Sequence, residues 1–128
     1  MTGPRRGPDR GQSTVELALV LPVVVLLLLV VLQVGLVARD VMLVAHAARE
    51  GARAAATDSD PFAADDAVEA AGGLDPDRLD VRTAGRDGPG SRVRVEVRYR
   101  IPTSVPLVGR FLGDHTVKTA VTMRVESP

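Results

Sequence analysis

A long uninterrupted apolar run occupies the N-terminal third of the chain. Residues 17–38 read LALVLPVVVLLLLVVLQVGLVA and contain no charged residue. At about 1.5 Å per residue, a helix of this length spans about 33 Å, which matches a hydrocarbon core of about 30 Å. The rest of the chain is too short to bury a helix that is apolar on every face. The run therefore predicts a membrane-spanning helix, in which Pro22 could produce a kink and Gln33 and Gly35 could mark a contact with another helix.

Beyond the apolar run, small apolar residues recur at three- and four-residue spacing, which is typical of one face of a helix. These positions are Val41, Val44, Ala45, Ala48, Ala52 and Ala55. The spacing predicts one continuous helix over Ser13–Ala56, weakened locally by Gly51. The pair Asp60-Pro61 predicts the start of a second, short helix with Asp60 as its N-cap, and Gly72-Gly73 predicts its end.

In the C-terminal part of the chain, apolar and polar residues alternate in three segments, which is the pattern of half-buried strands. The alternating inward positions are Leu79, Val81 and Thr83, then Val93, Val95, Val97, Tyr99 and Ile101, then Val117, Thr119, Val121, Met123 and Val125. The last two strands are separated by the loop Pro102–Asp114, which has an apolar patch at Val105, Leu107, Val108, Phe111 and Leu112. This order of elements predicts an α+β fold, with a three-stranded antiparallel meander against the long helix.

The charges that flank the apolar run predict how the chain is oriented in the membrane. The N-terminal tail carries Arg5, Arg6 and Arg10. By the positive-inside rule, the tail stays in the cytoplasm and the C-terminal part crosses the cytoplasmic membrane. We therefore expect a basic leader at residues 1–11, a single transmembrane helix at 12–38 within the lipid bilayer, a stem helix at 39–56 and a small extracytoplasmic head at 57–128.

Composition excludes several classes of function. The chain has no cysteine, which rules out disulfides, thiol catalysis and Cys-ligated metals. Sixteen basic and sixteen acidic residues give a net charge of zero, so no overall attraction to nucleic acid is expected. His46 and His115 stand apart, and no nucleophile motif is present, so we expect no metal, no cofactor and no enzymatic activity. The arginines of the second strand all fall on its polar face, which we interpret as a solvated surface: Arg92, Arg94, Arg98 and Arg100.

A single carboxylate lies at the N-terminal end of the predicted membrane span. Glu16 lies one residue before the apolar run. An ionisable residue in this position is costly to bury and is a candidate for function. Alternatively, Ser13 and Glu16 have the spacing of a capping box, so that Glu16 would only stabilise the start of the helix. The residues alone leave both interpretations open.

Two segments together resemble a known family. They are RGQSTVELALVLP at residues 10–22 and AAREGAR at residues 47–53. A basic tail, a glycine, four residues, a glutamate and an apolar helix form the pattern of type IV prepilins and pseudopilins. The fuller string is similar to the TadE-like family of tight-adherence (Flp) pilus proteins, and the similarity extends over residues 10–56.

This resemblance implies a non-enzymatic minor pilin or pseudopilin, built as a helical stem with a globular head. A prepilin peptidase would cleave after Gly11 and leave Gln12 as the new N-terminus. Glu16 would then pair with the terminal ammonium of a neighbouring helix and set the axial register of the bundle. The implied partners are other pilins or pseudopilins and inner-membrane assembly proteins, reached through the apolar helix. Leu17 follows the glutamate, where Flp-type prepilins usually carry tyrosine.

Two other functions remain open at this level. The chain could be a single-pass membrane protein whose head binds a partner in the cell envelope without polymerising. It could also be a secreted domain, because Ala45-His46-Ala47 has the A-x-A form that signal peptidase recognises. Cleavage would then follow Ala47.

Overall fold

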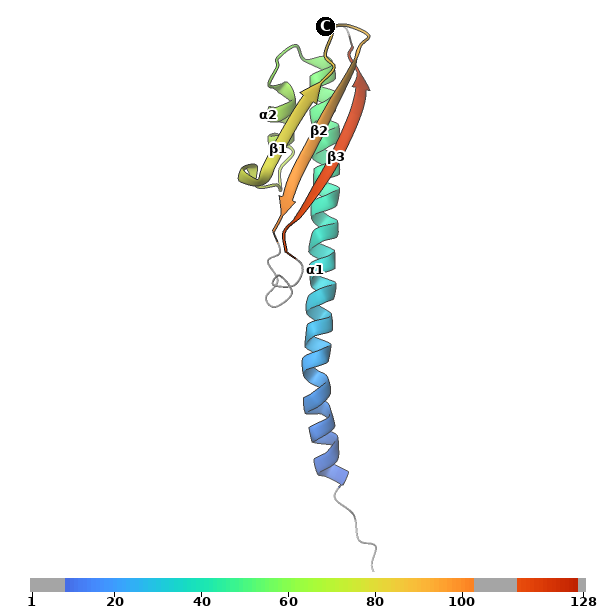
Figure 1. The fold of residues 1–128 in the computed structure, drawn as a ribbon, viewed down its shortest axis with the longest axis vertical. Helices are drawn as coiled ribbons and strands as arrows, with labels where there is room; N and C mark the ends of the chain where they lie inside the picture. The colour runs from blue at the N-terminus through green and yellow to red at the C-terminus, as the bar shows by residue number, and fades with distance from the viewer. Residues whose placement is uncertain (1–8, 103–112, 127–128) are drawn as a thin grey trace, which may run out of the picture.

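The computed structural model describes residues 9–102 and 113–126. Its elements are α1 (Asp9–Thr57), α2 (Ala63–Ala70), the 3-10 helix η1 (Pro76–Arg78), β1 (Leu79–Ala84), β2 (Arg92–Ile101) and β3 (His115–Arg124). Figure 1 shows α1 as a long rod, with the other elements gathered beside its C-terminal part. The predicted α+β class and the order of elements are confirmed. Residues 1–8 of the predicted leader and the predicted loop patch (Val105, Leu107, Val108, Phe111 and Leu112) lie outside the described residues.

Helix α1 is continuous over 49 residues, which corresponds to about 73 Å. The predicted continuity of the membrane and stem segments is confirmed, and the helix runs through Pro22. It begins at Asp9, four residues earlier than predicted. Ser13 therefore lies inside the helix and is not its N-cap, so the capping-box interpretation of Glu16 is wrong. At the other end, the Thr57 hydroxyl donates to the carbonyl of Arg53 at 3.0 Å.

Helix α2 begins at Ala63, two residues later than predicted. A carboxylate oxygen of Asp60 accepts a hydrogen bond from the Phe62 amide at 2.9 Å, and the Asp60 carbonyl accepts one from Ala63 at 3.3 Å. Asp60 therefore closes a turn before the helix, and the prediction that it is the N-cap is wrong. The predicted end is confirmed, because Gly72 has a φ of +76° and ends the helix in the left-handed region that favours glycine.

The three strands form an antiparallel meander in the order β1-β2-β3, as predicted. The register places Val81 opposite Val97 and Val95 opposite Val121, so the alternating apolar residues of all three strands share one face. On β2 this face is buried along its whole length, from Val93 to Ile101. The opposite face of the sheet carries the polar residues.

The core lies between the apolar face of the sheet and the second half of α1. The apolar core residues of α1 are Val44, Ala47, Ala48, Ala52, Ala55 and Ala56, and α2 adds Ala64 and Val68. The predicted alanine face is therefore shifted, since Ala47 is fully buried whereas Val41 is 39% exposed. The shift arises because α2 and the sheet both pack on α1, so the buried face has to be wide enough for two neighbours.

Candidate functional site

The first half of α1 is an exposed apolar rod. Within the described residues, one helix is long and apolar enough to span a membrane, and none of its most apolar window is buried in the chain. Large apolar side chains remain exposed from Val15 to Val34, with Leu19 72% exposed. Exposure of apolar surface on this scale is unfavourable in water. This half of the helix therefore requires a lipid bilayer, other helices, or both.

The predicted cleavage site lies at the end of the rod that is farthest from the head (Figure 1). Gly11 and Gln12 are in the first turn of α1, and Glu16 follows Gln12 by about one turn. Glu16 is exposed. Val44, the first fully buried residue of the head core, is 28 positions farther along the helix, or about 42 Å away. No residue of the head core can reach Glu16.

Gln33 and Gly35 lie in the second half of the apolar run but face different surroundings. Gln33 is only 4% exposed, and its carbonyl oxygen accepts no hydrogen bond from the part of the chain that the structure describes. Gly35 is exposed, and a side-chain Cβ at this position would meet nothing within 4 Å. Two positions that are two residues apart in a helix point in directions about 200° apart around its axis. The predicted contact with another helix therefore cannot use both residues on one face, and Gly35 is the open position.

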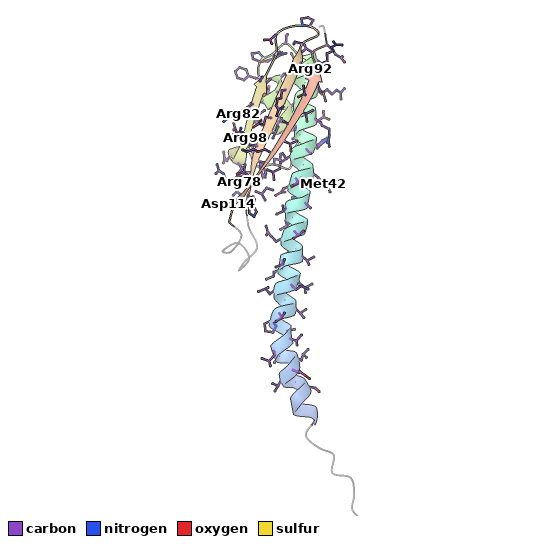
Figure 2. The ribbon with its side chains drawn as sticks, turned by 45° about the vertical axis from the view of Figure 1, so that its right-hand side comes forward. Met42, Arg78, Arg82, Arg92, Arg98 and Asp114 are labelled. Atoms are coloured by element: carbon purple, nitrogen blue, oxygen red, sulfur yellow. The ribbon has the colours of Figure 1, made fainter. Side chains whose placement is uncertain are left out.

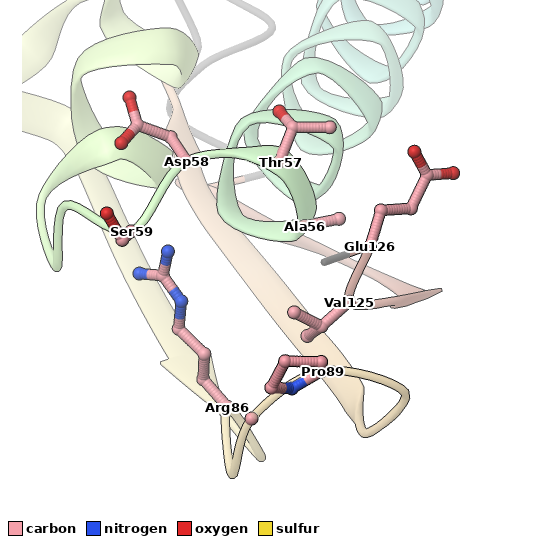
Figure 3. Close-up of a pocket in the computed structure, with 9 residues that line it drawn as sticks. Ala56, Thr57, Asp58, Ser59, Arg86, Pro89, Val125 and Glu126 are labelled. Atoms are coloured by element: carbon pink, nitrogen blue, oxygen red, sulfur yellow. The ribbon is translucent and has the colours of Figure 1, made fainter. Parts of the chain in front are cut away.

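A pocket of about 350 Å³ lies at the distal tip of the head (Figure 3). It is lined by Ala56, Thr57, Asp58, Ser59, Arg86, Gly88, Pro89, Val125 and Glu126. The Arg86 guanidinium donates to the Asp60 carbonyl at 2.8 Å, and the Glu126 amide donates to the Ala56 carbonyl at 3.0 Å. The first bond joins the α1–α2 connection to the β1–β2 turn, and the second joins the end of α1 to the segment after β3. Among the residues described, no group of three or more metal-ligating side chains comes together.

The outer face of the sheet is strongly charged. Arg92, Arg94, Arg98 and Arg100 all lie on this face, as predicted. The register adds Arg82, Lys118 and Arg124 from the neighbouring strands. Sequence reasoning did not group these residues, although the alternation of polar positions within each strand carries the signal.

Glu96 lies in the middle of this outer face. It accepts a hydrogen bond from Arg98 with 2.6 Å between Nε and Oε1. This hydrogen bond, together with the positive charges of Arg98, Arg94 and Lys118, lowers the pKa of Glu96 below the ordinary value of a glutamate, whereas partial burial opposes the shift. Glu96 is thus held as a carboxylate among basic side chains.

The fold defines a protein class with one candidate membrane helix that continues, as a stem, into a small α+β head. Residues 11–53 match the model of the TadE-like protein family, which confirms the resemblance over this segment. The match includes Gly11, Gln12, Glu16 and the stem up to Arg53, and it does not include the strands. No curated protein and no solved structure matches the chain. The family match suggests a protein associated with the tight-adherence (Tad) pilus.

Proposed function

We propose that this protein is a minor pilin or pseudopilin-like component of a tight-adherence pilus or of its assembly machinery. In this role it has no enzymatic activity and contributes to assembly through the apolar half of α1. The observation that carries the proposal is the exposed apolar rod of α1, combined with the TadE-like match over the same residues. The rod inserts into the cytoplasmic membrane and packs against the helices of other pilins or assembly proteins.

Glu16 has a specific task in this proposal. Prepilin peptidase cleaves after Gly11, so that the leader is removed and Gln12 carries the terminal ammonium. The nearest basic side chain in the remaining sequence is Arg39, 23 positions away or about 35 Å along the helix. The available cations are thus terminal ammonium groups, and in this proposal the Glu16 carboxylate pairs with that of a neighbouring helix. Two charges that are each costly in an apolar bundle neutralise one another and set the axial register.

The domain boundaries follow from this arrangement. Residues 1–11 form the cytoplasmic leader, 12–38 the membrane helix, 39–56 the stem and 57–128 the extracytoplasmic head. The Tad association is compatible with this division because α1 passes from an exposed apolar segment to a segment packed against the sheet.

The signal-peptidase alternative is less well supported by the packing of the head. Cleavage after Ala47 would separate Val44 and Ala47 from the head, and both side chains are fully buried in its core. Removal of buried aliphatic side chains destabilises a domain by several kcal/mol. A domain released at this position would therefore lack part of its own core.

The substitution Glu16→Gln tests assembly against simple anchoring. Gln keeps the size and hydrogen-bonding capacity of the side chain but removes its charge, which leaves the partner ammonium unpaired. The penalty for such an unpaired buried charge is about 3–5 kcal/mol. We expect normal membrane levels and a near-complete loss of protein from sheared pili or from the purified assembly complex. Glu126→Gln, at the exposed end of the head, is the matched control and should be incorporated normally.

N-terminal sequencing of the membrane-extracted protein accompanies this measurement. A start at Gln12 supports cleavage by prepilin peptidase, a start at Ala48 supports signal peptidase, and an intact N-terminus supports a plain anchor. Wild-type incorporation of the Glu16→Gln variant would defeat the pairing mechanism and leave the non-polymerising membrane anchor as the better account.

A further inference from the structure

The head separates its charges between two opposite surfaces. From Asp58 to Asp77 the chain has seven acidic and no basic residues, whereas β2 and β3 together have six basic residues and one acidic residue. Helices α1 and α2 pack on the same face of the sheet, because a Cβ on Gly51 of α1 would meet both Val68 of α2 and Val95 of β2. The outer side of α2 therefore faces away from the outer face of the sheet. A chain of zero net charge thus carries a basic outer face on β2 and β3 and an acidic segment that includes α2.

We define the basic face by its six cationic residues on β2 and β3. They are Arg92, Arg94, Arg98, Arg100, Lys118 and Arg124. Arg92 lies directly opposite Arg124, and Arg98 lies directly opposite Lys118. Figure 2 labels two of them, Arg92 and Arg98, at different heights along the sheet. Like charges opposite one another on neighbouring strands destabilise a sheet, so stability of the fold does not account for these residues.

Most of the charges on this face lack a partner. Arg98 is paired with Glu96. Arg92, Arg94, Arg100 and Lys118 form no ion pair with any of the described residues. These four cations are therefore available to bind a partner that supplies carboxylates.

The outer side of α2 supplies the complementary groups. Residues on this side recur at helical spacing from the N-cap onward and form what we call the acidic stripe: Phe62, Asp65, Asp66 and Glu69. Phe62, Asp66 and Glu69 are exposed, and Asp65 is half-buried. The three carboxylates form no ion pair within the described part of the chain. Phe62 is 68% exposed, which is unusual for a large aromatic side chain on a polar surface. An aromatic ring beside carboxylates is a favourable site for an arginine guanidinium, through stacking and charge-assisted hydrogen bonds.

The two surfaces lie at the same height along α1. Gly51 marks this height, because α2 and the centre of β2 both contact α1 there. The strands run beside α1, so the basic face looks sideways from the helix axis (Figure 1). A second molecule with its α1 parallel in the same membrane, displaced sideways without rotation, would bring its acidic stripe against the basic face of the first. No axial shift is required.

We propose that the basic face of one molecule binds the acidic stripe of a second copy of this chain. The proposal rests on the proposed function and deepens it by naming a partner of the head. The contact is heterologous, because it joins two different surfaces. Each molecule keeps one free basic face and one free acidic stripe, so the contact repeats along a row of molecules. The charge pairing is weakened by salt, because both surfaces are exposed.

Cysteine cross-linking of the full-length protein in native membranes tests the contact. The chain has no cysteine of its own. Ala70→Cys places a thiol beside the acidic stripe and Ala120→Cys places one on the outer face of β3, and both positions are exposed. With a bismaleimide cross-linker, we expect the double variant to give a ladder of dimers, trimers and higher species. Neither single variant should extend beyond a dimer, and the control pair His46→Cys with Ala120→Cys should give no ladder.

Charge reversal then tests the pairing itself. Arg94→Glu alters an exposed arginine that forms no ion pair with the described residues, so the substitution breaks no ion pair among them. Glu69→Arg places a cation in the last turn of α2, where the helix dipole favours it. Each change alone should lower the yield of the ladder roughly tenfold, and both together in one chain should restore it. An unchanged ladder in the Arg94→Glu variant would overturn the proposal.

Two further results would also overturn the proposed contact. The first is cross-linking of Ala120→Cys alone as efficiently as the double variant, which would mean that basic faces meet each other. The second is an Arg94→Glu variant that loses binding to anionic lipid vesicles but keeps the ladder. Pilus incorporation, measured in parallel, separates the two proposals. Incorporation without a ladder overturns only this inference, and a ladder without incorporation overturns only the proposed function.

Discussion

At the scale of single residues, Glu96 shows how a charged position is set by its neighbours across the sheet. Its hydrogen bond with Arg98, two residues along the same strand, is the largest contribution to its lowered pKa. Arg94 and Lys118 add coulombic contributions. Lys118 comes from β3 and is brought close only by the register of the sheet. Glu96 thus partly offsets the basic face, and Asp80 of β1, opposite Arg98, lies beside it.

The lowered pKa predicts a stability difference that depends on pH. The folded state binds the Glu96 proton less tightly than the unfolded state, so the contribution of Glu96 to stability is fully present above about pH 4.3, the ordinary pKa of a glutamate. It is lost as the pH falls through the lower pKa of the folded state. We expect Glu96→Gln to lower the melting temperature at pH 7. In strong acid, the variant and the wild type should have the same melting temperature. Thermal unfolding in detergent measures both, and an equal difference at both pH values would contradict the prediction.

At the scale of elements, the crossing of α1 and α2 depends on a single glycine. A Cβ on Gly51 would lie 2.6 Å from Cγ2 of Val68 and 3.2 Å from the carbonyl oxygen of Ala64. In sequence terms Gly51 only weakens the helix. In the structure its missing side chain lets the two helices and the sheet approach one another closely.

We therefore expect Gly51→Ala to destabilise the head, although alanine is the better helix former. The gain in helix propensity is about 1 kcal/mol, whereas overpacking of a tight core costs about 1–3 kcal/mol and here forces α2 away from α1. The melting temperature of the head, followed by circular dichroism, should fall. Gly35→Ala is the matched control, because a Cβ there meets nothing within 4 Å. A higher melting temperature for Gly51→Ala would show that α2 is not held at this crossing.

At the scale of the whole molecule, α1 passes from an exposed apolar segment to a stem that is packed against the head. The change in side-chain size follows the change in surroundings. Val and Leu side chains predominate in the exposed half, and alanines predominate among the core residues of the half that contacts the sheet. Small residues allow the sheet and α2 to pack close to the helix axis, and large apolar residues favour a bilayer.

The proposed topology predicts which part of the chain a protease can reach. With the leader in the cytoplasm and the head outside, protease added to intact spheroplasts should digest the head and leave a membrane-protected fragment that contains the apolar half of α1. Lysed spheroplasts provide the control for protease activity. Full protection of the head in intact spheroplasts would reverse the orientation and exclude the contact with extracytoplasmic pilus components.

The elements of this protein were largely predictable from local patterns. The apolar run, the three-and-four spacing of the stem and the alternation in β1, β2 and β3 each depend on residues close in sequence, and each pattern selects one secondary structure. The boundaries were less predictable. Asp60 has the sequence signature of an N-cap, yet its carboxylate closes the preceding turn, because a side chain of this type can satisfy either set of backbone amides.

Tertiary structure decided which residues meet. The buried face of α1 was shifted to include Ala47 and Gly51 because two elements pack on it. Helical periodicity alone does not show how many elements pack against a helix. The basic face required the strand register, since Lys118 and Arg124 are far from β2 in sequence. The sequence by itself thus determined an apolar helix, a stem and three strands, through short-range periodicity. Packing and pairing between distant segments determined the close crossing at Gly51 and the separation of charge across the head.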